Sequence, residues 1–261
     1  SAGSDAAAMK LKAVRHNDGW LLNGQKVFTT SAHFADWYWV GARTDPDAKK
    51  HHGISLFLIR MDDPGLTIHP MYTMGAERTN AVFFDNVFVH DDYRVGDLNK
   101  GFQYIAEALD IERFSMFTFS PIRGRMELLC DYVKTAKRDG KPLKDDPVIR
   151  QKIAQLTTEL EVARVLGVRF VDAALNSTKT PTVEASHYKL YATELSRRIA
   201  DATMDIVGPG AQLALRTEDA PLKGRSESCY TYTVIDTIGG GSSEVQRNII
   251  ATRGLGLPRN F

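Results

Sequence analysis

Alternating apolar and polar positions mark the first third of the chain as β-structure. Residues 10–16 alternate at a period of two, and later runs are rich in β-branched and aromatic residues. These runs, which clusters of turn residues separate, cover residues 20–30, 37–43, 54–60, 66–69 and 81–89. The run over residues 20–30 is interpreted as a hairpin that turns at Asn23 and Gly24. Closely spaced strands without helices between them predict a compact antiparallel barrel or sandwich.

The pattern then changes to a helical period, with apolar residues three and four positions apart from residue 102 onward. Two long stripes of this kind run from Ile149 to Ala174 and from Tyr188 to Ile206. Such stripes are buried when helices pack into a bundle. The chain is therefore predicted to be an α+β protein, with an antiparallel β-barrel or sandwich domain over residues 1–97 and an up-down α-helical domain, a four-helix bundle, over residues 98–261.

Composition and charge narrow the class of protein. The 261 residues are 43% hydrophobic and 25% charged with a net charge of +1, which gives no electrostatic basis for binding nucleic acid or an anionic membrane. No apolar run approaches the roughly 18 residues that a membrane span needs. Cys130 and Cys229 have neither CxxC nor zinc-like spacing, so we expect no metal site and a reducing, cytoplasmic compartment. The start at Ser1, within a loop of small residues, leads us to expect a preceding segment.

The glycine-rich run Ile238–Arg247 is the first candidate for chemistry. Its three consecutive glycines allow a sharp bend and the close approach of a ligand to the backbone. Ser242 and Ser243 follow where a helix N-cap would be, so free amide groups would converge on an anionic or carbonyl oxygen. The alternative is a glycine-rich loop that only caps a surface helix.

The second candidate is the acidic pair Asp110 and Glu112, which precedes Arg113 in a predicted helix with mostly apolar neighbours. Burying a carboxylate there as a charge is costly unless it is partnered, and such an acid can act as a general base near neutral pH. The alternatives are a solvated acid–base pair and a structural ion pair from Glu112 to a neighbouring helix. Pro121 is expected to kink this helix.

Phe28 and Thr30 are the third candidate, at the end of the predicted hairpin. Two residues apart on a strand, they would point to the same face. An aromatic ring and a hydroxyl on one face could stack on a planar heterocycle and hydrogen-bond to it. The alternative is a half-buried strand of an ordinary β-domain.

Read in order, these segments and several others resemble motifs of the acyl-CoA dehydrogenase family of flavoproteins. The matching segments are Gly3–Asp5, Asn23–Lys26 with Phe28–Thr30, Asp63–Leu66, Phe84–Val89, Glu112–Arg113 and Gly240–Arg247. Each motif is weak alone, but their common order over the whole chain makes the resemblance specific. It covers the family's middle β-domain and C-terminal helical domain, whereas the family's N-terminal helical domain is not in this chain.

The resemblance implies that the chain binds FAD in an extended form. Phe28, where the family commonly has Trp, would lie against the isoalloxazine, and Thr30 would lie near its N5 and O4 edge. Ser4 would contact the pyrophosphate region. Ser242 and Glu244 would lie near the adenosine end.

The resemblance also implies α,β-dehydrogenation of an acyl-CoA thioester to the trans-2-enoyl-CoA, with hydride transfer to flavin N5. The backbone amide of Gly240 and a ribityl hydroxyl would hold the thioester carbonyl as an oxyanion hole, with Gly241 beside them. Asp110 and Arg113 would lie by the CoA part of the substrate.

The position of the catalytic base departs from the commonest pattern of the family. Many members have a glutamate where this chain has Gly240. A minority, including the isovaleryl and long-chain enzymes, place the base in a Glu-Arg dipeptide on an earlier helix, and Glu112–Arg113 falls on that position. Glu112 is therefore predicted to remove the α-proton. Candidates for the acyl pocket, whose specificity stays open, are Met116, Phe117 and Phe119.

A second departure concerns the neighbouring subunit. The family's Arg-x-Thr-Phe-Gly element, which reaches the FAD pyrophosphate of the adjacent protomer, reads Ala136–Gly140 here and lacks its Arg and Thr. We therefore expect a heterotetramer in which this chain is the catalytic half and a homologous partner supplies those contacts. Bacterial α2β2 enzymes of the family, several of which act on steroid side chains, divide the work in this way. The alternative is a homotetramer in which Lys137 or Arg138 substitutes.

The expected setting is lipid metabolism, either fatty-acid β-oxidation or steroid catabolism, with electron-transfer flavoprotein as the electron acceptor. Two other functions stay open: a flavin oxidase or monooxygenase of the same fold, and a non-catalytic subunit that binds no flavin and supports an active partner. Gly240 and the lost phosphate contacts favour the non-catalytic subunit, whereas Glu112, Phe28 and Thr30 oppose it.

Overall fold

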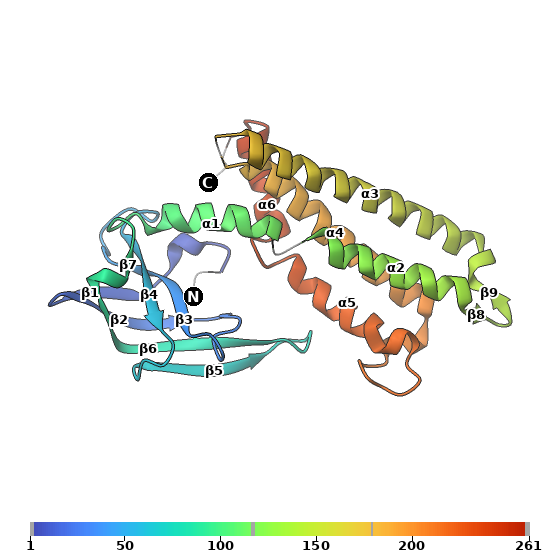
Figure 1. The fold of residues 1–261 in the computed structure, drawn as a ribbon, viewed down its shortest axis with the longest axis horizontal. Coiled ribbons are helices and arrows are strands. Elements are labelled where there is room, and N and C mark those ends of the chain that lie inside the picture. The colour runs from blue at the N-terminus through green and yellow to red at the C-terminus, as the bar shows by residue number, and fades with distance from the viewer. Residues whose placement is uncertain (1–2, 116–117, 179, 259–261) are drawn as a thin grey trace. The chain divides into compact units, whose positions relative to one another are not determined.

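The computed structural model describes residues 3–115, 118–178 and 180–258. The chain forms two compact units, Ser1–Ala108 and Leu109–Phe261. In Figure 1 the strands of the first unit are blue to green, and the helices of the second run from green to red. A sheet unit followed by a helical unit confirms the predicted α+β class.

The first unit contains a seven-stranded sheet in the order β5-β6-β2-β1-β3-β4-β7. Its strands are β1 (Lys12–His16), β2 (Gly19–Lys26), β3 (Trp37–Arg43), β4 (Ile54–Arg60), β5 (Leu66–Tyr72), β6 (Arg78–His90) and β7 (Arg94–Val95), with the short helices η1 (Ala6–Ala8) and η2 (Asp91–Tyr93). Neighbouring strands are antiparallel except β1 and β3, which are parallel. Alternate side chains of the strands form one core around Leu22, Phe57 and Val82.

The hairpin predicted at Asn23 and Gly24 is wrong. The chain turns between β1 and β2 at residues 17–18, where His16 pairs with Gly19, and β2 continues through Gly24. The register of β2 against β6 shifts between Leu22 and Gly24. Asn23 instead accepts a hydrogen bond at 2.9 Å from the backbone amide of Asn86. The Asn-Gly pair therefore forms a bulge, because a glycine with φ of +133° tolerates the irregular backbone there.

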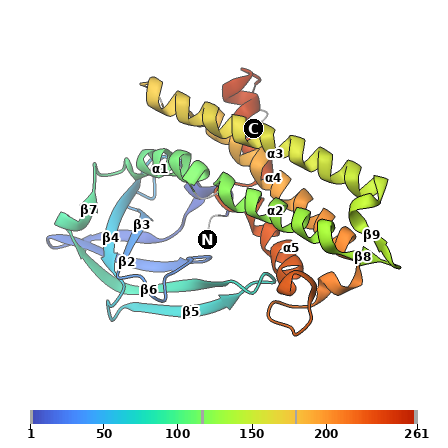
Figure 2. The same ribbon diagram turned by 45° about the vertical axis from the view of Figure 1, so that its right-hand side comes forward.

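The second unit is a helical bundle. Its helices are α1 (Gly101–Ser115), which starts in the first unit, α2 (Phe119–Thr135), α3 (Pro147–Asn176), α4 (Thr182–Val207), α5 (Arg225–Asp236) and α6 (Ser243–Ile249), which the π-helical turn η6 (Ile250–Gly254) extends. Shorter elements are β8 (Lys137–Arg138), β9 (Lys141–Pro142), η3 (Leu143–Asp145), η4 (Pro209–Gln212) and η5 (Pro221–Gly224). Helix α4 packs against α2, α3 and α5, and Figures 1 and 2 show these four side by side. The stripes predicted to be buried supply this core, which includes Leu160 and Leu195.

The kink predicted at Pro121 is wrong, because Pro121 lies at the start of a separate helix. Helix α1 ends at Ser115, and Pro121 is the third residue of α2, where its missing amide would have no partner within the helix. Helix α3 begins with Pro147, and the Asp146 carboxylate accepts hydrogen bonds from the next two amides at 2.8 and 3.2 Å. Of the helices described, none is long and apolar enough to cross a membrane.

Candidate functional site

A glycine turn joins α5 to α6 in the helical unit. Gly240 and Gly241 have φ of +63° and +94°, in the left-handed region that favours glycine. A Cβ added to Gly241 would lie 2.6 Å from Nε2 of Gln246. The predicted N-cap is confirmed, because the Ser242 hydroxyl accepts a hydrogen bond from the amide of Val245 at 3.4 Å. Backbone conformation and close packing both require glycine at position 241.

Three side chains hold the carbonyl groups of this turn from inside the unit. Arg113 Nε donates to the Gly240 carbonyl at 3.3 Å, and Lys189 Nζ donates to the Gly241 carbonyl at 2.9 Å. Gln246 Nε2 donates to both carbonyls, at 3.1 and 3.0 Å. Because a trans peptide points its C=O and N–H in opposite directions, these contacts direct the amides of Gly241 and the next residue away from the buried donors.

The predicted Glu-Arg pair lies near the end of α1. Arg113 and Asp110 are nearly buried and form an ion pair, and Asp110 also accepts a hydrogen bond from Thr182 Oγ1 at 2.6 Å. Burial lowers the pKa of Arg113, while the charge of Asp110 acts in the opposite direction. Glu112 is half-buried on the same helix. The contact of Arg113 with Gly240 brings together two predicted motifs that are 127 residues apart in the chain.

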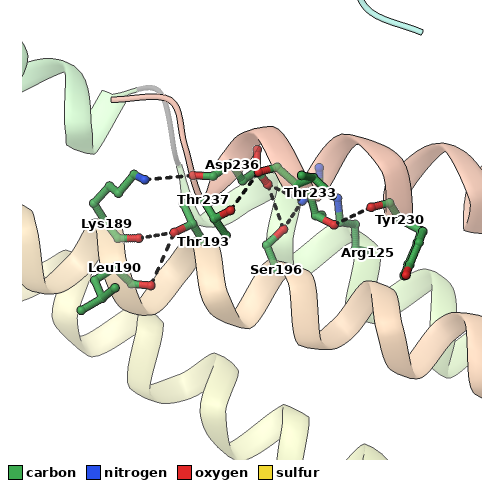
Figure 3. A network of polar contacts seen from close by, with 10 residues as sticks. Arg125, Lys189, Leu190, Thr193, Ser196, Tyr230, Thr233, Asp236 and Thr237 are labelled. Atoms are coloured by element: carbon green, nitrogen blue, oxygen red, sulfur yellow. Dashed lines mark hydrogen bonds and ion pairs between the residues drawn. The ribbon is translucent and has the colours of Figure 1, made fainter. Parts of the chain in front are cut away.

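A buried polar network continues from this turn between α2, α4 and α5 (Figure 3). Lys189 donates to the backbone carbonyl of Asp236 at 2.9 Å, and the Asp236 carboxylate accepts from Ser196 at 3.2 Å and from Arg125 at 3.4 Å. Arg125 also donates to Ser196. Burial raises the pKa of Asp236, which the charge of Arg125 opposes, and burial lowers the pKa of Lys189 to about 8.

Sequence reasoning missed this network. The signal it could have used is Lys189 itself, a lysine directly after Tyr188 in the stripe that was predicted to be buried. A charged residue beside such a stripe needs buried partners, since an unpaired buried charge is costly.

The predicted flavin-facing residues lie in the first unit, in a loop and not on a strand. Strand β2 ends at Lys26, and Phe28 has φ of +57°, so the expected alternation between Phe28 and Thr30 does not apply. The loop is held at Thr29, whose amide donates to the Asn80 carbonyl and whose carbonyl accepts from the Asn80 side chain, both at 2.9 Å. Phe28 is 69% exposed and Thr30 is exposed, so this anchored loop presents a ring and a hydroxyl to solvent.

The remaining predicted residues lie on the surface or outside the described residues. Ser4 is exposed in the turn before η1. Glu244 is exposed in the first turn of α6, where hydrogen bonds from its own amide and from Ser242 lower its pKa. Met116 and Phe117 lie outside the described residues, whereas Phe119 packs against the core of the helical bundle.

The segment over residues 136–140, which the resemblance had led us to expect to differ from a subunit-bridging element, forms a short hairpin in the structure. Strands β8 and β9 pair around Asp139 and Gly140, whose φ values are +51° and +78°. Arg138 Nη2 donates to the carbonyl of Ile206 at 2.6 Å. The guanidinium group therefore caps the C-terminal end of α4, where its positive charge also interacts favourably with the negative end of the helix dipole.

Comparison with known families assigns both parts of the chain. The model for the acyl-CoA dehydrogenase middle domain matches residues 1–87, and the model for the acyl-CoA dehydrogenase C-terminal domain matches residues 99–255. The chain therefore belongs to the acyl-CoA dehydrogenase family, which confirms the resemblance found in the sequence.

Several proteins from Mycobacterium tuberculosis are similar to this chain over nearly its whole length. Acyl-CoA dehydrogenase FadE26 is 31% identical over 99% of this chain and 66% of its own length. Among solved structures, the ChsE4–ChsE5 complex from the same organism is 33% identical with a TM-score of 0.90, covering 99% of this chain and 67% of that one. The Tcur3481–Tcur3483 steroid ACAD is 30% identical with a TM-score of 0.92, covering 100% of this chain and 66% of that one. The chain thus spans about two thirds of the length of these relatives.

Proposed function

We propose that this chain forms the catalytic part of a FAD-dependent acyl-CoA dehydrogenase that converts an acyl-CoA thioester to the trans-2-enoyl-CoA. The observation that carries the proposal is the Arg113–Gly240 contact, which links the Glu-Arg pair to the glycine turn. In that reaction Glu112 removes the proton from Cα of the substrate. When bound, FAD supplies the redox chemistry by accepting the hydride from Cβ.

The residues of the chain fit a flavin cofactor. Phe28 and Thr30 present an exposed ring and hydroxyl on a loop that two hydrogen bonds at Thr29 fix in place. In the helical unit, the Ser243 hydroxyl is buried and has no partner within the described part of the chain. We propose that Phe28 and Thr30 contact the isoalloxazine. Ser4 would then contact the pyrophosphate, and Ser242 and Glu244 would lie near the adenosine end.

The glycine turn is proposed to hold the substrate's thioester carbonyl. The amide of Gly240, with Gly241 beside it, stabilises the negative charge that develops on the carbonyl oxygen when the α-proton leaves. One such donor is typically worth ~3 kcal/mol of activation free energy. Glycine at 240 has no side chain to act as a base, so the proton falls to Glu112. Asp110 and Arg113 are proposed to lie by the CoA part of the substrate, and Arg113 also steadies the turn.

Replacement of Glu112 tests the proposal directly. In the holoenzyme, Glu112→Gln is expected to slow anaerobic bleaching of the flavin band by acyl-CoA by about 10²- to 10⁴-fold, since it removes the base but keeps the shape of the side chain. The measurement is stopped-flow absorbance with fatty acyl and steroid side-chain thioesters. Glu107→Gln is the matched control, because Glu107 lies exposed on the same helix and should leave the rate unchanged. An unchanged rate in Glu112→Gln would refute the assignment of the base.

The lack of a base at Gly240 also favours a second candidate, a non-catalytic subunit that supports an active homologous partner. The same experiment separates the two functions. If the wild-type protein binds no flavin, either alone or with its homologous partner, the non-catalytic function is the better explanation. Rapid reoxidation of the reduced flavin by oxygen would instead point to an oxidase or monooxygenase of the same fold.

A further inference from the structure

Lys189 of α4 is completely buried and contacts both ends of the segment that contains the glycine turn. Its ammonium group donates to the carbonyls of Asp236 and Gly241, each at 2.9 Å. Figure 3 shows the Lys189 side chain reaching toward the end of α5. One side chain therefore ties the last residue of α5 to Gly241, the last glycine of the turn.

Glycine at positive φ is conformationally permissive, so the shape of the turn must come from its contacts. With the Gly241 carbonyl drawn toward Lys189, the amide of Ser242 points the opposite way, because the peptide unit between them is trans and planar. Arg113 and Gln246 act in the same way on the carbonyl of Gly240. The buried donors thus set the direction of the outward amides.

At neutral pH, Lys189 holds the turn as a charged donor. Hydrogen bonds from an ammonium group to carbonyls are about twice as strong as those from a neutral donor. Burial opposes the charge and lowers the pKa of Lys189 to about 8, so the group is mostly protonated at neutral pH. The charged groups that act on it are Asp236 of α5, Arg113 of α1, Glu194 of α4 and Glu244 of α6, and Arg125 of α2 neutralises the Asp236 carboxylate.

We propose that Lys189 is a positioning residue of the dehydrogenase site, which fixes the backbone of the Gly240–Gly241 turn and thereby keeps the Gly240 amide in place at the substrate carbonyl. The proposal rests on the dehydrogenase function proposed above. The claim that Lys189 fixes the conformation of the turn can be tested without substrate.

Hydrogen exchange in the purified holoenzyme tests that hold. The amides of Gly239 and Ser243 bracket the turn and donate to Ile235 and Thr237 at 2.9 and 3.0 Å. Lys189→Met is expected to speed their exchange by about tenfold or more, since two charge-assisted hydrogen bonds are lost. Thr203→Val is the matched control, because Thr203 is buried in the same helix and its hydroxyl donates to the carbonyl of Ile199, one turn earlier in that helix. Equal exchange in wild type and Lys189→Met would overturn the proposal whatever the activity.

Kinetics test the link to the reaction. Lys189→Met is expected to lower kcat by roughly 10²-fold with little change in KM. A displaced amide loses more of its hydrogen bond to the transition state than of its hydrogen bond to the bound substrate. Wild-type kcat is expected to fall above about pH 8, where Lys189 loses its charge. Lys189→Arg, which keeps a charged donor at every working pH, should recover part of kcat and remove that fall. An increase in KM alone would overturn the positioning role. Failure of wild type to reduce its flavin would refute the proposed function, and the exchange result would still stand.

Discussion

At the scale of single residues, the candidate site depends on buried side chains that donate hydrogen bonds to the backbone carbonyls of the glycine turn. Arg113, Lys189 and Gln246 donate to two successive carbonyls, while the glycines between them have no side chain with which to resist a change of shape. The sequence predicted the turn and its Ser242 cap, because both follow from local residue types. It could not predict Arg113 and Lys189 as donors, since they come from helices far away in the chain.

Gly241→Ala is expected to lower the free energy of unfolding by about 1–3 kcal/mol. The new Cβ would lie 2.6 Å from Gln246 Nε2, and alanine would have to adopt φ of +94°. Urea unfolding followed by circular dichroism measures the change. Gly124→Ala in α2 is the control and should change the free energy of unfolding in the opposite direction, because a Cβ there meets nothing within 4 Å. Alanine inside a helix should raise stability by roughly 0.5–1 kcal/mol. Equal effects of both substitutions would contradict the prediction.

The buried charge of Lys189 predicts a specific pH dependence of stability. Its pKa is about 8 in the folded protein and near 10.5 in the unfolded chain, so between these values the unfolded state binds more protons. Stability therefore rises with pH across this window. The contribution is on the order of 2–3 kcal/mol. Denaturant midpoints of wild type and Lys189→Met from pH 7 to 10.5 measure it, and parallel curves for the two proteins would argue against a buried titrating lysine.

At the scale of elements, sequence patterns predicted strands and helices well where local periodicity alone sets which side chains are buried. The predicted strands over residues 37–43 and 54–60 coincide with β3 and β4. Wrong predictions arose where one side chain makes a distant contact. Asn23 forms a hydrogen bond with Asn86 and shapes a bulge, while Thr29 is drawn to Asn80 and takes Phe28 off the strand. Neither partner can be recognised from local propensity.

Helix α3 offers a test at this scale. Asp146→Ala is expected to lower the free energy of unfolding by about 1 kcal/mol, because the carboxylate caps two of the first amides of the helix. Thermal or chemical denaturation measures the loss. Asp145→Ala, which removes the neighbouring exposed acid of η3, should change stability by much less. If both variants lose the same stability, loss of the cap is not the cause.

At the scale of the whole molecule, the segment over residues 136–140 bears on assembly. Ala136 stands where the resemblance leads us to expect an arginine, and the guanidinium of Arg138 is already bonded to the end of α4. We propose that a homologous partner subunit supplies the missing phosphate contacts in a heterotetramer. One of the similar structures is itself a complex of two differently named chains, ChsE4 and ChsE5.

Cofactor content tests this assembly. The full-length protein purified alone is expected to hold much less than one FAD per chain, and co-expression with its homologous partner should restore the flavin. Visible absorbance against protein concentration, together with native mass spectrometry, measures both quantities. Full occupancy in a homotetramer of this chain alone would contradict the proposal and favour Lys137 or Arg138 as the substitute.

The sequence by itself determined the order of a sheet and a helical bundle, the cap of α6 and the family. These properties follow from periodicity, local hydrogen bonding and motifs in a fixed order, all of which are written along the chain. Only the tertiary structure decided that Arg113 contacts Gly240 and that Lys189 joins Asp236 to Gly241. The reason is physical: a buried donor is chosen by the carbonyls that the fold brings to it, and those lie dozens of residues away.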